Sequence, residues 1–141
     1  MRHSTSSPHA LTLTLLGPRM AICRLSPGDA VPVWAENART FLSITRTTTE
    51  LSIVTEQALL PAELEAQRGY CALRVEGPLP LDMVGVVASL ASPLAAAGVP
   101  IFPLATYDTD YLLMGEEMLH RALRALTSAG HTIVQGPQER P

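Results

Sequence analysis

The sequence predicts an α+β protein made of two βαββαβ units in tandem, each an antiparallel sheet with helices on one face. The first observation is an internal repeat, because sliding the chain against itself by about 60 residues brings several segments into register. Residues 11–18 (LTLTLLGP) then align with residues 71–78 (CALRVEGP), and residues 41–56 align with residues 101–116. The second observation is that the order of strand, Gly-Pro, paired apolar runs and acidic turn recurs in both copies. Such a period is typical of a duplicated supersecondary unit.

The second copy, assigned to residues 69–135, has the clearer pattern. The segment YCALRVE at residues 70–76 predicts a strand that ends at Gly77-Pro78. A helix rich in small apolar residues follows, and we expect Asp82 to cap its N-terminus. Small side chains let such a helix pack closely on a sheet.

The rest of this copy follows in order. Pro93 removes one backbone donor from the helix and predicts a kink, and Gly98 predicts its end. The apolar runs IFPLAT and YLLM flank an aspartate-containing turn and predict a hairpin. Apolar residues at helical spacing from Met118 to Leu126 predict a second helix that Gly130 ends, and HTIV predicts a last strand.

The first copy, assigned to residues 10–68, is a degraded version of the same unit. LTLTLL predicts its first strand, which RMAICRL can extend after a kink at Gly17-Pro18. PVWAENA predicts a short helix, FLSITRT and LSIVT a hairpin, and LLPAELEAQ a second helix. The remaining residues, 1–9 and 136–141, are expected to form disordered tails.

Composition narrows the classes of function. The chain has 141 residues, of which 47% are hydrophobic and 16% charged, as in a folded domain or two small ones that share a core. A net charge of −3 and 4% aromatic residues argue against nucleic-acid binding. The first apolar run is too short to span a membrane. Two distant cysteines, Cys23 and Cys71, predict buried reduced thiols in a cytoplasmic protein.

Two aspartates, Asp108 and Asp110, lie in the otherwise apolar stretch LATYDTDYLLM. Buried carboxylates are unfavourable unless something satisfies them, so they indicate a turn, a metal, a substrate or a cationic ligand. The histidines lack metal-ligand spacing, and the chain has no GxSxG, no P-loop and no GxGxxG after a strand. We therefore expect no catalysis, no cofactor and no metal.

Three segments together resemble a known family: RTTTELSIVTE (46–56), the run from RVEGPLP to AAAGVPIF (74–102) and LATYDTDYLLM (104–114). Their order resembles ACT domains, and is most similar to the tandem branch that includes Castor-type arginine sensors and small stand-alone bacterial proteins. The resemblance implies ferredoxin-like units and a regulatory protein that binds a free amino acid. Pro103 and the minimal first helix depart from the family pattern.

The resemblance also implies a ligand site between the two units. Its residues would be Ser52, Ile53, Val54, Asp82, Met83, Val84, Gly85, Val86, Tyr107, Asp108 and Asp110. Backbone N–H groups at the helix N-terminus would hold the ligand carboxylate. Asp110 aligns with the acidic Glu50 at the 60-residue offset, which makes it the expected partner of a ligand ammonium or guanidinium. Simpler explanations stay open: both aspartates can be turn formers, and Asp82 only a helix cap.

The sequence thus predicts an amino-acid sensor, with two alternatives. One is a protein-interaction module with a vestigial ligand site, and the other is a small enzyme. The expected partners are a free amino acid and a second copy of the chain in a homodimer, because an open sheet edge invites pairing. We expect no nucleic acid and no membrane, and the sequence does not indicate the amino acid or the downstream protein.

Overall fold

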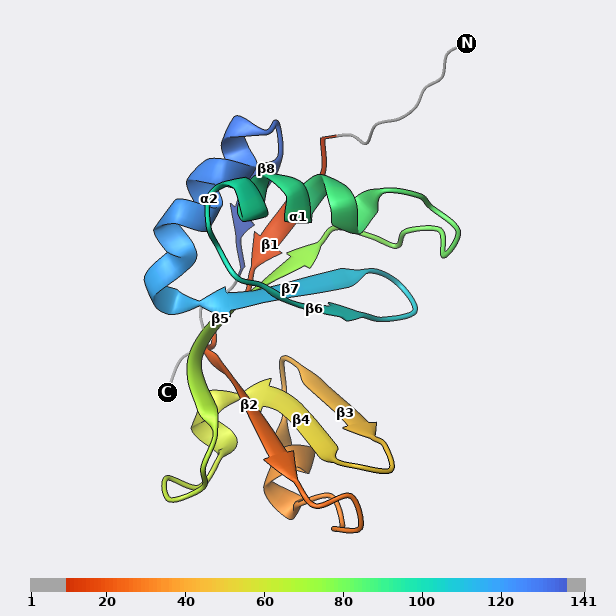
Figure 1. Cartoon of the computed structure of the whole chain (residues 1–141), viewed down its shortest axis with the longest axis vertical. Helices are drawn as coiled ribbons and strands as arrows, with labels where there is room; N and C mark the ends of the chain where they lie inside the picture. Colours follow the sequence, from red (N-terminus) through yellow and green to blue (C-terminus); the bar gives the residue numbers. More distant parts are fainter. Residues whose placement is uncertain (1–9, 137–141) are drawn as a thin grey trace. The chain divides into compact units, whose positions relative to one another are not determined.

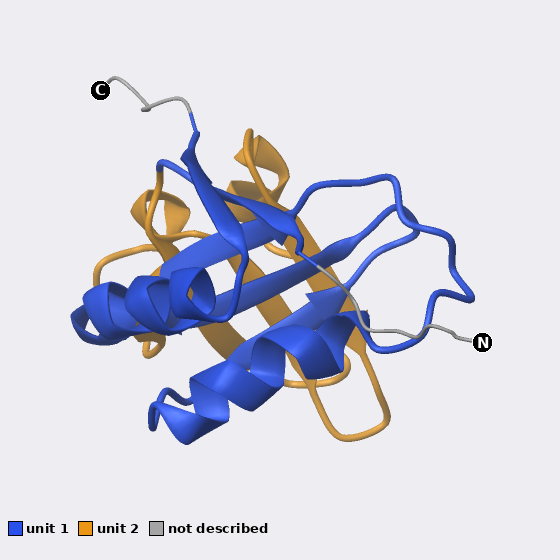
Figure 2. Cartoon of the chain, turned by 90° about the horizontal axis from the view of Figure 1, so that it is seen from above, with its two compact units in different colours: residues 1–17, 71–137 blue, residues 18–70, 138–141 orange. Residues whose placement is uncertain are grey.

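A computed structural model of the chain describes residues 10–136. Within them lie eight strands and two α-helices, with three short 3-10 helices (Figure 1). The chain divides into two compact units (Figure 2). Unit 1, in blue, contains the described residues up to Gly17 and from Cys71 onward, and unit 2, in orange, contains residues 18–70. The predicted α+β class is confirmed.

Unit 1 is a five-stranded sheet with two helices. Its strands are β1 (Thr12–Leu15), the second part of β5 (Gln67–Val75), β6 (Phe102–Ala105), β7 (Asp110–Gly115) and β8 (Thr132–Gln135). They lie in the order β6-β7-β5-β1-β8. The β1–β8 pair is parallel, whereas β1–β5 and β6–β7 are antiparallel. The helices are α1 (Val86–Ala96) and α2 (Leu119–Ser128), the latter preceded by the 3-10 helix η3 (Glu116–Met118).

Alternating strand residues form the core of unit 1. Leu13, Leu73 and Met114 pack with Leu90 and Leu94 of α1 and with residues of α2 in one buried cluster. Because successive side chains of a strand point to opposite faces, this alternation puts both helices on the same face of the sheet. Burying each such leucine contributes about 1.5–3 kcal/mol.

Both helices end as the sequence predicts. Gly98 and Gly130 have φ angles of 76° and 101°, which glycine adopts without strain. The N–H of Val99 donates to the carbonyl of Leu94 at 2.9 Å, and the N–H of His131 donates to that of Leu126 at 3.0 Å. These bonds satisfy carbonyls of the last turn in each helix.

The start of α1 differs from the prediction. Asp82 does not cap it, because the helix begins at Val86 after Gly85, whose φ is 88° and which makes no side-chain cap. The N–H of Met83 instead donates to the carbonyl of Pro80 at 3.1 Å. Asp82 therefore lies within a separate turn that precedes the helix. Gly85 follows this turn in the left-handed conformation, which glycine adopts without strain.

Unit 2 is a smaller antiparallel sheet in the order β3-β4-β2-β5. It contains β2 (Met20–Leu25), β3 (Leu42–Arg46), β4 (Leu51–Glu56) and the first residues of β5, with the 3-10 helices η1 (Val33–Asn37) and η2 (Gln57–Leu59). Its core gathers the buried side chains of Ala21, Cys23, Ala35, Leu51, Ile53 and Leu60. The predicted hairpin is confirmed, and PVWAENA forms η1.

The prediction of a helix at LLPAELEAQ is wrong. Leu60 is extended, with φ −75° and ψ 137°, immediately before Pro61. A proline disfavours helical geometry in the residue that precedes it, so the helical turn stops there. The guanidinium of Arg68 then donates to the carbonyls of Pro61 at 2.8 Å and Leu64 at 3.0 Å, which replaces helical bonding in this segment.

The N-terminal strand lies in a different unit from the one expected. Residues 10–17 belong to unit 1, where Leu13 pairs with Val75 in an antiparallel ladder. The two strands that the repeat aligned are therefore neighbours in one sheet. Leu13 and Leu15 explain this placement, since both are buried in the core of unit 1. The expected tails at 1–9 and 137–141 lie outside the described residues, whereas Gly136 is buried and its N–H donates to Leu15.

The two hairpins correspond at an offset of 59 residues rather than 60. Strand β4 begins at Leu51 and β7 at Asp110. The turn bonds agree: the N–H of Thr47 donates to the carbonyl of Glu50 at 2.9 Å, and that of Thr106 to Thr109 at 2.8 Å. Glu50 therefore corresponds to Thr109, which removes the alignment that favoured Asp110.

Candidate functional site

The turn between β6 and β7, residues 106–109, is fixed by its own threonines. The N–H of Thr106 donates to the carbonyl of Thr109, and the N–H of Thr109 donates back to Oγ1 of Thr106 at 3.1 Å. The Oγ1 of Thr109, a buried residue, donates to the carbonyl of Val75 at 2.6 Å. This last bond ties the turn to the end of β5.

The loop after β5 runs against the same turn. The N–H of Leu79 donates to the carbonyl of Asp108 at 2.7 Å. A Cβ added to Gly77 would lie 3.0 Å from that carbonyl oxygen, so glycine favours this close approach. These contacts hold the loop after β5 against the turn of residues 106–109, and the two segments form two walls of a cavity.

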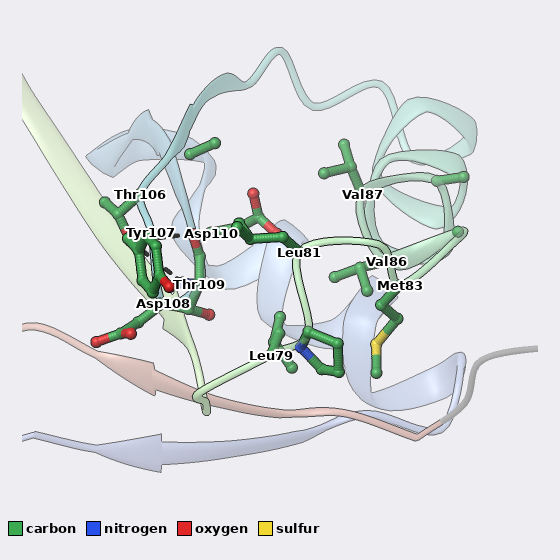
Figure 3. A pocket seen from close by; sticks show the side chains of 14 residues that line it. Leu79, Leu81, Met83, Val86, Val87, Thr106, Tyr107, Asp108, Thr109 and Asp110 are labelled. Atoms are coloured by element: carbon green, nitrogen blue, oxygen red, sulfur yellow. Dashed lines mark hydrogen bonds between the residues drawn. The ribbon is translucent and has the colours of Figure 1, made fainter.

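Between these walls and the start of α1 lies a cavity of about 350 Å³ (Figure 3). This volume is in the range of small-molecule sites, which begin at about 300 Å³. Its lining is mostly apolar, with two carboxylates and two threonines. The lining residues are Leu79, Pro80, Leu81, Met83, Gly85, Val86, Val87, Ala88, Ala105, Thr106, Tyr107, Asp108, Thr109 and Asp110.

The two aspartates of the turn are oriented differently. In Figure 3 the side chain of Asp110 extends toward Leu81 and helix α1, whereas the carboxylate of Asp108 points away from them. Asp110 is half-buried and Asp108 is exposed. No cationic side chain lines this cavity, so Asp110 is the charge that faces a ligand placed beside α1.

The N-terminus of α1 supplies hydrogen-bond donors to the same cavity. The N–H of Ser89 donates to the carbonyl of Gly85 at 2.9 Å, and is thus the first N–H bonded within the helix. The N–H groups of Val86, Val87 and Ala88 precede it and have no helical carbonyl to bond. All three residues line the cavity.

Six of the predicted site residues line this cavity: Met83, Gly85, Val86, Tyr107, Asp108 and Asp110. Asp82 and Val84 lie on the same loop but outside the lining. Residues 52–54 lie on β4 of unit 2, where Ile53 and Val54 are buried. The expectation of a site between the two units stays a prediction.

Sequence reasoning did not name eight of the lining residues: Leu79, Pro80, Leu81, Val87, Ala88, Ala105, Thr106 and Thr109. The two threonines carried a signal, because the pattern Thr-x-x-Thr in a hairpin turn permits the reciprocal bonds seen here. The leucines carried none, since an apolar residue after Gly-Pro is equally compatible with core packing.

Other kinds of site have little support among the described residues. Cys23 and Cys71 are free and buried. Burial raises the pKa of the Cys23 thiol, although the charge of Arg68 opposes the shift, so Cys23 is not an activated nucleophile. Residues 10–136 contain no group of three metal-ligating side chains and no helix long and apolar enough to cross a membrane.

Comparison with known proteins agrees with this fold. The ACT domain family matches residues 65–128, and a second family, defined by an N-terminal domain, matches residues 19–63. Protein VC0802 from Vibrio cholerae is 21% identical with a TM-score of 0.70, covering 86% of this chain and 91% of that one. The regulatory subunit of aspartate kinase from Thermus flavus is 17% identical with a TM-score of 0.59, covering 86% and 99%. At these identities the likeness shows the fold alone.

A stronger match is the protein Atu0741 from Agobacterium tumefaciens. It is 34% identical with a TM-score of 0.87, and the alignment covers 95% of this chain and 99% of that one. Because this identity extends over nearly the whole of both proteins, the chain belongs to the same family as Atu0741, and its residues 65–128 match the ACT domain.

Proposed function

We propose that the protein is a non-catalytic regulatory protein that binds a free α-amino acid in the cavity of unit 1. The match to the ACT domain supports a regulatory role in which the protein binds a small molecule. The observation that carries the proposal is the side chain of Asp110, which extends into an apolar cavity whose lining contains no cation.

The cavity offers a partner for each part of such a ligand. The carboxylate of Asp110 accepts hydrogen bonds from the α-ammonium, and these charge-assisted bonds are the stronger kind. The free N–H groups of Val86, Val87 and Ala88 donate to the α-carboxylate, helped by the helix dipole. Leu79, Leu81 and Met83 surround the ligand side chain. These apolar contacts favour an aliphatic side chain over a cationic one.

The internal repeat does not favour Asp110 over Asp108. At the offset of 59 residues, Asp110 corresponds to Leu51, so acidity at this position is not common to both hairpins. Asp110 is preferred because of its direction and its partial burial. Asp108 points the other way and has no role in this site.

The test compares two conservative variants of the full chain. Asp110→Asn should weaken binding of the amino acid selected by a thermal-shift screen by about tenfold to a hundredfold, since a hydrogen bond to a charged group contributes about 1.5–3 kcal/mol. Asp108→Asn should leave the affinity of this cavity nearly unchanged. The amide chemical shifts of residues 86–88, which line this cavity, measure both affinities during a titration. An Asp110→Asn variant that binds like the wild type would contradict the site, and a screen without any ligand would contradict the function.

A protein-interaction role is the second candidate, because apolar side chains are exposed around the cavity. Leu81 and Val84 are 72% and 87% exposed, and Tyr107 is 81% exposed. The amino-acid screen separates the two roles, since an interaction module with a vestigial site gives no shift. The closer resemblance to Castor-type arginine sensors, the homodimer and the cytoplasmic location stay predictions.

A further inference from the structure

A second cavity, of about 430 Å³, adjoins the turn of residues 106–109 and differs in character from the first. It shares Thr106, Asp108 and Thr109 with the first cavity but contains no residue of α1. The other lining residues are Arg74, Val75, Glu76, Gly77, Pro78 and Tyr111. Arg74 lies between Leu73 and Val75, whose side chains are in the core beneath the helices. The alternation of β5 therefore directs Arg74 to the opposite face of the sheet.

Within residues 10–136, the charged side chains of this cavity have no partner. Arg74 is half-buried, and its guanidinium makes no hydrogen bond or ion pair within residues 10–136. The carboxylates of Glu76 and Asp108 also have none there, although both line the same cavity. A half-buried cation without a partner is unfavourable. Opposite charges that share a cavity without pairing are available to a ligand that carries both signs.

The walls of this cavity are held by bonds described above. The Oγ1 of Thr109 donates to Val75 at 2.6 Å, and the N–H of Leu79 donates to Asp108 at 2.7 Å. A Cβ added to Gly77 would lie 3.0 Å from the carbonyl oxygen of Asp108, which is closer than most Cβ contacts. Strand end and turn are thus fixed relative to one another before a ligand arrives, which lowers the entropy cost of binding.

We propose that this cavity is a second binding site, which takes a small zwitterion through Arg74 at one end and Asp108 and Glu76 at the other. The planar guanidinium of Arg74 donates two parallel hydrogen bonds to a carboxylate, a geometry that lysine cannot reproduce. The carboxylates accept from the ammonium group. The first cavity has no cationic side chain, so the two sites differ in how they hold a carboxylate. This site does not depend on an amino acid being bound in the first.

The test uses glycine as probe, with acetate and methylammonium as ligands that carry one charge each. Amide chemical shifts of the labelled full chain should change with glycine at Arg74, Gly77 and Tyr111. Residues 86–88 report separately on the first cavity. Acetate and methylammonium should each bind at least about tenfold more weakly than glycine, because each satisfies only one end of the site.

Variants complete the test. Arg74→Gln should reduce glycine affinity by about tenfold or more, and Arg74→Lys should lose part of it. Arg121→Gln, which removes an exposed arginine on α2, should leave it unchanged. Shift changes confined to residues 86–88 would overturn the second site and leave the first intact. Acetate that binds as well as glycine, or an Arg74→Gln variant with full affinity, would also overturn it. The shift map of the wild type does not require any variant to fold.

Discussion

The carbonyl oxygen of Ser89 accepts a hydrogen bond from Nε2 of His131 at 3.2 Å, across 42 residues of sequence. This carbonyl would normally accept from the N–H four residues later in α1, but that residue is Pro93, which has none. The other ring nitrogen of His131, Nδ1, accepts from the N–H of Leu11 at 3.1 Å. A buried neutral imidazole therefore replaces the bond that proline removes and joins α1 to the residues immediately before β1 and β8.

Replacing this imidazole should be costly. We expect His131→Phe to lower the free energy of unfolding by about 2–4 kcal/mol, because it leaves the Ser89 carbonyl and the Leu11 N–H without partners in a site where His131 is 6% exposed. His120→Phe, at an exposed position on α2, is the matched control and should change it by less than about 0.5 kcal/mol. Urea denaturation of the full chain measures both, and equal midpoints would refute the role of His131.

The link to Pro93 has its own test. Pro93→Ala restores the N–H that bonds to Ser89, so His131 becomes less important in that background. We expect a double-mutant cycle of Pro93→Ala and His131→Phe to give a coupling energy of about 1 kcal/mol, with the double variant more stable than the single effects predict. Strict additivity would mean that the imidazole acts only through Leu11.

A second buried polar group holds the entry to β3. One oxygen of Glu56, Oε2, accepts from the N–H groups of Arg39 at 2.8 Å, Thr40 at 2.5 Å and Phe41 at 3.2 Å. Three donors converge on this oxygen of a residue that is 8% exposed. The carboxylate of Glu56 therefore serves as the shared acceptor of these three amides.

We expect Glu56→Ala to destabilise the chain by about 3 kcal/mol, because it removes the oxygen that accepts three hydrogen bonds, one of them buried. Glu56→Gln retains one acceptor oxygen and should be less destabilising. Glu63→Ala, at an exposed position of the same unit, should have little effect. Thermal or denaturant unfolding measures all three. Should Glu56→Ala unfold like Glu63→Ala, the three bonds would contribute nothing net.

The sequence predicts those elements whose signals are local, and fails where a partner distant in sequence decides. Gly98 and Gly130 end helices by their own backbone freedom, and both hairpins follow from apolar runs around a polar turn. The hydrogen bonds that Glu56 accepts from residues 39–41 were not predictable. The 60-residue offset aligned Glu56 with Glu116, whereas the offset of 59 in the hairpin bonds aligns it with Gly115. Leu13 and Leu15 were assigned to the wrong unit, since alternation identifies a strand but not the sheet that it joins. In the cavity the acidic turn was visible, but the orientation that separates Asp110 from Asp108 was not.

The buried thiol of Cys23 predicts a loss of stability in alkali. Burial raises its pKa above the ordinary value of 9.0, so between that value and the folded pKa the unfolded chain releases a proton that the folded chain keeps. The unfolding free energy should therefore fall as the pH rises above 9, by at most about 1.4 kcal/mol per pH unit from this group. Cys23→Ala should remove the contribution of this thiol to the fall in unfolding free energy with pH. Because the chain has no lysine, few other groups titrate in this pH range. Identical slopes for both proteins between pH 8 and 10 would contradict this.

The apolar lining of the first cavity predicts which amino acids bind. Leu79, Leu81 and Met83 surround the space beside Asp110 and offer no acceptor to a second cationic group. Burying an aliphatic side chain there contributes about 0.8 kcal/mol per CH₂ group, whereas burying an unpaired ammonium or guanidinium is unfavourable. We therefore expect leucine, isoleucine, valine and methionine to raise the melting temperature more than lysine or arginine at equal concentration.

Two analogues and one variant test this site further. Leucinamide, which lacks the carboxylate, and isovalerate, which lacks the ammonium, should both bind weakly. Leu81→Ala should lower leucine affinity severalfold and leave glycine affinity at this site nearly unchanged. A screen in which arginine or lysine gives the largest shift, and loses it on Asp110→Asn, would show that the carboxylate binds a cationic side chain instead.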